Sequence, residues 1–95
     1  MKKTFLAGIA VLAIASTTAS AFYTECTVTK EMHLANRPNG SSDPRFGIIN
    51  KGDKVAFRDK HKDWWFVIHY NGNTPEYGWV PRNVLTNCQV QEGTP

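Results

Sequence analysis

The stretch of sequence that decides the fold reads GDKV at residues 52–55, DWWFVIHYNG at 63–72 and GWVPRNVL at 78–85. Its apolar runs are short, rich in aromatic and β-branched residues, and separated by glycine, asparagine and proline. This punctuation is typical of short antiparallel strands. The sequence therefore predicts an all-β protein, folded as a small antiparallel barrel.

The apolar runs place the strands at residues 23–30, 32–34, 46–49, 54–58, 65–70, 77–80 and from 84 onward. In the run 65–70, we expect Phe66, Ile68 and Tyr70 to point into the core. Because side chains alternate along a strand, the rest of that run would then point outward, and a one-residue slip would reverse the two faces. Charged residues 59–63 predict a hairpin tip, residues 71–76 a long turn, and residues 81–83 a single 3₁₀ turn.

The first residues have the pattern of an export signal. Lys2 and Lys3 precede an apolar run over residues 5–16, and small residues at 19–21 supply a cleavage site. We predict cleavage after Ala21, the alternative being an uncleaved anchor. The chain then divides into a signal peptide (1–21), a folded domain (22–88) and a polar, frayed tail (89–95), in the periplasm or secreted from a bacterium.

Loss of the signal also changes the charge of the protein. The whole chain has eleven Lys and Arg against eight Asp and Glu. Removal of Lys2 and Lys3 leaves a net charge of +1. A protein this close to neutral lacks the excess of positive charge expected of a nucleic-acid binder.

The two cysteines lie near opposite ends of the predicted mature chain. A domain this short has only marginal stability from its hydrophobic core alone. The predicted export would place Cys26 and Cys88 in an oxidising compartment, where disulfides form. We therefore expect a Cys26–Cys88 disulfide that joins the first and last strands. A redox-active pair is disfavoured because there is no Cys-x-x-Cys spacing.

Four motifs, in order, resemble the bacterial SH3 (SH3b) domain family. They are MHLANRP at residues 32–38, KGDKV at 51–55, WFVIHYNG at 65–72 and GWV at 78–80. The resemblance implies an SH3-like barrel that binds cell-wall peptides. The chain departs from the family pattern at Arg37, where the family has glycine, and between Gly72 and Gly78, where its turn is longer.

Residues 63–65 and 78–85 are also similar to eukaryotic-type SH3 domains. Trp64 and Pro81 match two positions of the groove that binds proline-rich peptides in that family. The tyrosine of that groove is replaced by Val84, so polyproline binding is not expected here.

The aromatic residues are the best candidates for a ligand site, since a domain this small cannot bury all of them. We expect a shallow aromatic groove near the loop at residues 36–45, flanked by polar groups. The candidate ligand-binding residues are Trp64, Trp65, Tyr77, Trp79, Asn36, Arg37 and Asp63. The alternative is that the aromatic rings cap the ends of the core.

Other polar residues give little sign of catalysis or metal binding. His33, His61 and His69 are widely spaced, fit no metal-ligand pattern, and are expected to be ordinary surface side chains. Asp63 and Glu76 are the conceivable acid–base pair, although nothing in the sequence places them together. We predict a non-enzymatic module without metal or cofactor that binds a cell-wall peptide or an envelope protein. The alternative is a periplasmic inhibitor or immunity-type protein acting on a wall-degrading enzyme.

Overall fold

The computed structural model describes residues 21–95 and consists of antiparallel strands with one 3₁₀ turn. The all-β prediction is confirmed for this part of the chain. The predicted signal peptide lies, apart from Ala21, outside the described residues. The elements are β3 (Phe22–Val28), β4 (Met32–His33), β5 (Ile48–Ile49), β6 (Lys54–His61), β7 (Trp64–Asn71), β8 (Thr74–Pro81), η1 (Arg82–Val84) and β9 (Leu85–Glu92).

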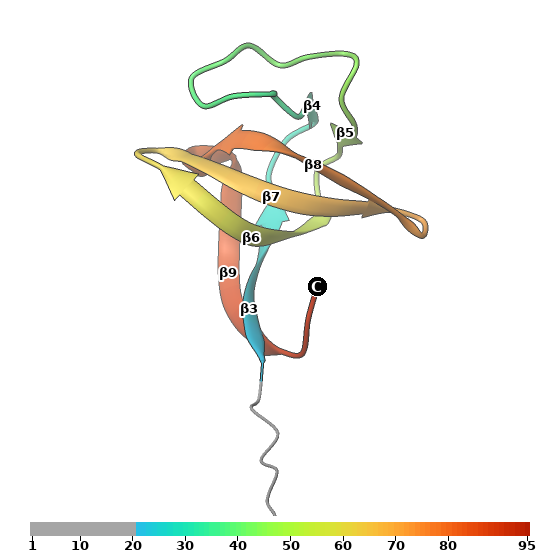
Figure 1. The fold of residues 1–95 in the computed structure, drawn as a ribbon, viewed down its shortest axis with the longest axis vertical. Coiled ribbons are helices and arrows are strands. Elements are labelled where there is room, and N and C mark those ends of the chain that lie inside the picture. Colours follow the sequence, from blue (N-terminus) through green and yellow to red (C-terminus); the bar gives the residue numbers. More distant parts are fainter. Residues whose placement is uncertain (1–20) are drawn as a thin grey trace, which may run out of the picture.

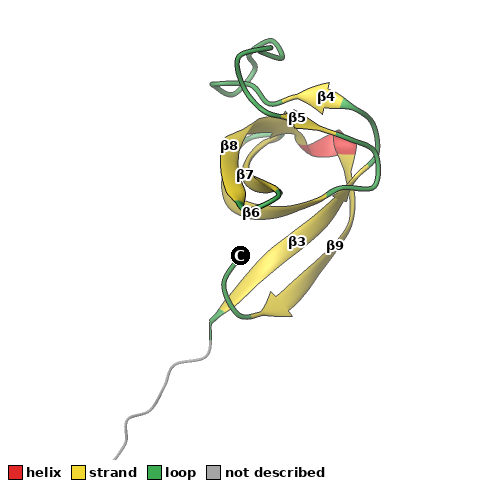
Figure 2. Cartoon of the chain, turned by 90° about the vertical axis from the view of Figure 1, so that its right-hand side faces the viewer, coloured by secondary structure: helices red, strands yellow, loops and turns green. Residues whose placement is uncertain are grey.

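Five strands form one sheet in the order β8-β7-β6-β3-β9, and β4 pairs with β5 in a small second sheet. Strands β6, β7 and β8 follow one another as a meander, while β3 pairs with both β6 and β9 (Figure 1). Figure 2 shows β6–β8 curving round one side of the molecule, with β3 and β9 running together away from them. The start of β3 and the end of β9 lie together at one end of this ribbon, and the last residues turn back toward β7, where the Tyr70 hydroxyl donates to the Pro95 carbonyl at 3.0 Å (Figure 1).

The outer edge of β8 is covered by the segment that follows β4. The Ala35 amide donates to the Trp79 carbonyl at 2.9 Å, and the Trp79 amide donates back to the Ala35 carbonyl at 2.8 Å. Gly78 permits this approach, because a β-carbon there would overlap the side chain of Leu34. Leu34 and Ala35 are fully buried as a result.

The core lies between the curved sheet and the β4–β5 pair. It is built mainly from aliphatic residues, each contributing about 1.5–3 kcal/mol by burial. Its members are Cys26, Val28, Leu34, Ile49, Val55, Val67, Val80, Val84 and Leu85, with Met32, Phe46, Trp65 and Cys88 packed against them. Residues 46–49 thus return apolar side chains to the core, as the sequence predicts.

Strand β7 differs in part from the expected arrangement. Ile68 is buried, as expected, but Val67 is buried too and joins the core with Trp65 packed against it, whereas Phe66 is half-buried and Tyr70 is exposed. Both faces of this strand are apolar in sequence, so alternation alone does not select one of them. The choice follows from the packing of Val67 in the core with Leu34 and Ile49, which come from distant segments.

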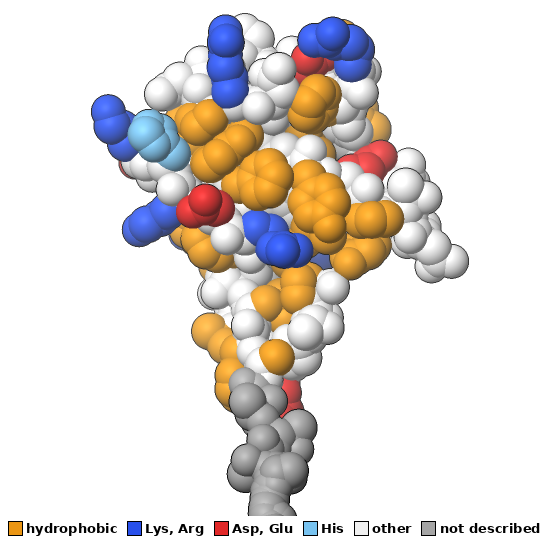
Figure 3. Space-filling model, in the orientation of Figure 1, with side chains coloured by type: hydrophobic (Ala, Val, Ile, Leu, Met, Phe, Trp, Pro, Cys, Tyr) orange, Lys and Arg blue, Asp and Glu red, His pale blue; other side chains and the backbone are white. Residues whose placement is uncertain are grey.

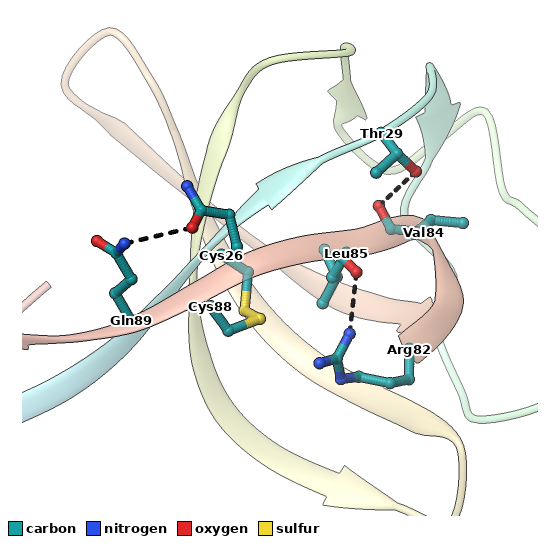
Figure 4. The surroundings of a disulfide bond; sticks show 8 residues. Cys26, Thr29, Arg82, Val84, Leu85, Cys88 and Gln89 are labelled. Carbon is teal, nitrogen blue, oxygen red and sulfur yellow. Dashed lines mark hydrogen bonds between the residues drawn. A yellow bond between two sulfur atoms is a disulfide. The ribbon is translucent and has the colours of Figure 1, made fainter.

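The disulfide prediction is confirmed. Cys26 of β3 and Cys88 of β9 are bonded across a sequence separation of 62 residues (Figure 4). The β3–β9 register shifts at this point, so Asn87 and Cys88 together oppose Cys26, and Asn87 has a positive φ of 51°. This arrangement is a β-bulge. The bulge places the sulfur of Cys88 against the nearly fully buried Cys26.

Two segments are more regular than the sequence indicates. The prediction of a long turn over residues 71–76 is wrong. Asn71 pairs directly with Thr74, so only Gly72 and Asn73 form the loop. Gly72 has a φ of 65°, which suits the first loop position of a tight hairpin. The residues expected to fray after Cys88 are also strand as far as Glu92, since the main-chain ladder with β3 extends to the Phe22–Glu92 pair.

Candidate functional site

The hairpin tip between β6 and β7 meets the 3₁₀ turn η1 at a hollow of about 350 Å³. We call it the Trp64 hollow; its lining residues are Asp63, Trp64, Pro81, Arg82 and Asn83. Trp64 pairs across the sheet with Pro81, and the Arg82 amide donates to the Asp63 carbonyl at 2.7 Å. The hollow therefore combines two apolar rings with a carboxylate, a guanidinium and an amide.

Arg82 forms a fixed wall of the Trp64 hollow that the sequence did not single out. Its guanidinium lies 4.6 Å from the ring centroid of Trp65, and its Nη1 donates to the Leu85 carbonyl at 2.9 Å (Figure 4). A cation held over an indole ring and bonded to the main chain has few free rotamers. Its position directly after Pro81, in the 3₁₀ turn that the sequence correctly predicts, could have identified Arg82 as a candidate.

Trp65 lies on the core side of β7 and is not among the residues that line the Trp64 hollow. Its ring meets Phe57 edge to face, with 4.6 Å between the centroids. The two adjacent tryptophans therefore differ in their surroundings. Trp64 borders the hollow, whereas Trp65 contacts Arg82, which lines the hollow.

Tyr77 and Trp79 lie on the outer face of the sheet and form a strip with Phe66. The ring centroid of Phe66 is 6.1 Å from that of Tyr77 and 5.2 Å from that of Trp79. The Arg58 guanidinium lies 5.9 Å from the Tyr77 ring centroid. Figure 3 shows hydrophobic side chains gathered across the face of β6–β8, with a basic side chain among them. We call these three rings the aromatic strip.

Asn36 and Arg37 line a different hollow, of about 300 Å³, formed by the loop at residues 36–45. In this loop Arg45 contacts Asp43 through both Nε and Nη2, at 3.1 and 2.9 Å. These hydrogen bonds hold the pKa of Asp43 below its usual value and raise that of Arg45. This loop hollow shares no lining residue with the Trp64 hollow, so Asn36 and Arg37 border a different hollow from Trp64 and Asp63.

The histidines are not all surface side chains, contrary to expectation. His69 is buried, with Nδ1 3.1 Å from Glu76 Oε1 and Nε2 3.1 Å from Asp53 Oδ2. His33 is half-buried, and its Nδ1 lies 3.1 Å from the Phe46 carbonyl. Of the three histidines, His61 alone is exposed. His69 thus ties β7 to β8 and to the turn before β6.

The conceivable acid–base pair has no common site. Glu76 is engaged with His69, whereas Asp63 borders the Trp64 hollow. Within residues 21–95, no group of three or more histidine, cysteine or acidic side chains is arranged to hold a metal ion. The described part of the chain also has no helix of the length and apolarity needed to cross a membrane.

Comparison with known proteins yields no relative: no protein-family model, no curated protein and no solved structure matches this chain.

Proposed function

We propose that this protein is an exported, non-enzymatic binding module with an SH3-like barrel, which holds a cell-wall peptide in the Trp64 hollow. The barrel is supported by three features: the β6–β8 meander, the 3₁₀ turn before β9, and the two hydrogen bonds between Ala35 and Trp79. Together they would close a curved sheet on itself, in the order of elements that the sequence motifs suggest.

Export is supported by the signal-like residues 1–21 and by the disulfide. A Cys26–Cys88 bond is compatible with an oxidising extracellular compartment. Bacterial cytoplasm keeps most thiols reduced, so a domain that depends on this bond would be stable only after export.

The observation that carries the binding proposal is the chemistry of the Trp64 hollow. Trp64 and Pro81 offer apolar surface, while Asp63, Arg82 and Asn83 surround it with polar groups of both charges. A few polar groups around apolar walls fix the orientation of a ligand that the apolar walls hold. A short peptide carries both kinds of group, with amides and charged ends for the polar rim and side chains for the rings.

A second candidate is a protein–protein inhibitor or immunity-type protein that acts on a wall-degrading enzyme. The aromatic strip favours it, because Tyr77 is 45% exposed and extends the apolar surface outside the Trp64 hollow. Exposed aromatic residues are enriched at protein interfaces. A short peptide in the hollow would leave this strip uncovered, whereas a folded partner would cover it.

The two candidates are separated by retention on purified sacculi and by affinity capture from an envelope extract. We expect wild-type protein to be retained on sacculi at low salt, and Trp64→Ala to weaken retention at least about tenfold, as for a central binding residue. Tyr70→Ala is the matched control, since Tyr70 is exposed but does not line the hollow.

Both variants must first show the thermal unfolding of the wild type. Absence of wild-type retention at low salt would contradict the cell-wall proposal. Capture of one dominant envelope protein, reduced when Tyr77 is changed to alanine, would support the inhibitor instead.

A further inference from the structure

Strands β3 and β9 extend beyond the rest of the sheet as a two-stranded arm. β3 pairs with β6 only over residues 25–27, whereas its ladder with β9 continues to the Phe22–Glu92 pair. We define the arm as residues 22–24 and 90–92, which project from the body in Figures 1 and 2. Within the described chain, β9 has β3 as its one neighbour in the sheet.

The two edges of the sheet differ in how they are protected. The β8 edge is covered by Ala35 and carries proline at positions 75 and 81. Strand β9 contains no proline, lysine or arginine, and its one charged residue is Glu92 at the end. Proteins usually protect a free edge with charge, proline or a bulge, because its unpaired main-chain groups recruit further strands. The bulge at residues 87–88 protects the first half of β9 and leaves residues 89–92 free.

One face of the arm is apolar and uncovered. Side chains alternate along β3, so Phe22 and Thr24 share the face of Cys26 and Val28, which are core residues. Val90 lies opposite Thr24 and therefore belongs to the same face. Phe22 is 62% exposed and Val90 is 70% exposed. The core-facing side of the ribbon thus runs past the core and ends in two exposed apolar side chains.

We propose that this edge pairs with the β9 edge of a second copy of the chain, antiparallel and centred on Val90. A two-fold axis at this point sets Val90 against its equivalent, so the two exposed valine side chains pack together on the same face of the joined sheet. Gln89 then lies opposite Gln91 of the second copy, and Glu92 lies opposite Cys88, so no like charges face each other.

The self-complementary chemistry of the strand favours a second copy over an unrelated chain. In antiparallel register this ladder of glutamine and valine places no like charges opposite each other, and it pairs the exposed Val90 with its own equivalent, which shields apolar surface of both copies. The free ladder is short, so the association is weak and depends on protein concentration. The Trp64 hollow lies at the opposite end of β9, beyond η1, and stays open in the pair.

Sedimentation velocity of the exported, oxidised protein tests this proposal, with concentrations from about 1 µM to about 1 mM. We expect a monomer–dimer equilibrium whose dissociation constant rises at least about tenfold in Val90→Lys. Thr74→Lys is the matched control, because Thr74 is exposed on the other edge strand. It should change the constant less than about twofold.

Amide hydrogen exchange of the wild type provides a second measurement that does not depend on folding of the variant. Exchange in residues 89–92 should slow as the protein concentration rises, while exchange in β8 should not change. A monomer over the whole concentration range would overturn the proposal, as would equal effects of Val90→Lys and Thr74→Lys. Neither result would bear on peptide binding, because the measurements contain no ligand.

Discussion

Loss of the disulfide should remove a large part of the stability of this domain. The Cys26–Cys88 bond closes a loop across 62 residues. In the chain-entropy model a loop of that length restricts the unfolded chain by about 4 kcal/mol. Since small domains have total stabilities of about 5–15 kcal/mol, the reduced protein should lie near its folding threshold.

The assay is chemical denaturation and thermal melting of three samples: the oxidised protein, the reduced protein and the Cys26→Ala/Cys88→Ala double variant. We expect the last two to unfold alike, with the free energy of unfolding about 4 kcal/mol lower and the melting temperature about 16–30 °C lower. The double variant is also the control for the reductant, which should leave it unchanged. A loss below about 1 kcal/mol would refute the reasoning, because the unfolded chain would then gain little freedom from breaking the bond.

Three further changes test the packing and electrostatics. Gly78→Ala should lower the free energy of unfolding by about 1–3 kcal/mol, measured by denaturation, because its β-carbon would overlap a core side chain. His69→Leu should cost about 2–4 kcal/mol by removing both hydrogen bonds to carboxylates, whereas His61→Ala at the exposed hairpin tip should change stability by less than about 0.5 kcal/mol. Arg45→Ala should raise the pKa of Asp43 toward 3.8, as followed by NMR titration. Because the folded-state pKa of Asp43 is depressed, its stabilising contribution is present above the unfolded-state value and is lost as the pH falls through the folded-state value.

The strand pattern and the disulfide could be read from the sequence because both depend on local chemistry. Glycine, asparagine and proline mark most of the strand ends, and the two cysteines of this chain have one possible pairing within it. The 3₁₀ turn was also predictable, since Pro81 fixes its own φ near −63° and precedes a segment too short for a strand.

The inward face of β7 was not predictable because both faces are apolar. His69 could be buried because Asp53 and Glu76, from other segments, bond to both of its ring nitrogens. The alternation of side chains along β7 also divides the candidate tryptophans between two sites. Trp64 and Asp63 share a hollow, whereas Trp65, only one residue further, faces the core.

The loop at residues 36–45 is fastened at both ends independently of its own sequence. Ala35 is held by its two hydrogen bonds to Trp79, and the Leu34 amide donates to the Gly47 carbonyl at 2.9 Å. These anchors use main-chain atoms, and within the loop only a few residues add ties of their own: the Ser42 hydroxyl accepts from the His33 amide at 3.2 Å, and Asp43 is bonded to Arg45. The other loop positions make fewer bonds to the sheet and are the ones open to variation. The domain is therefore suited to be a display scaffold, in which randomised loops are selected for new targets while a covalently tied framework stays the same.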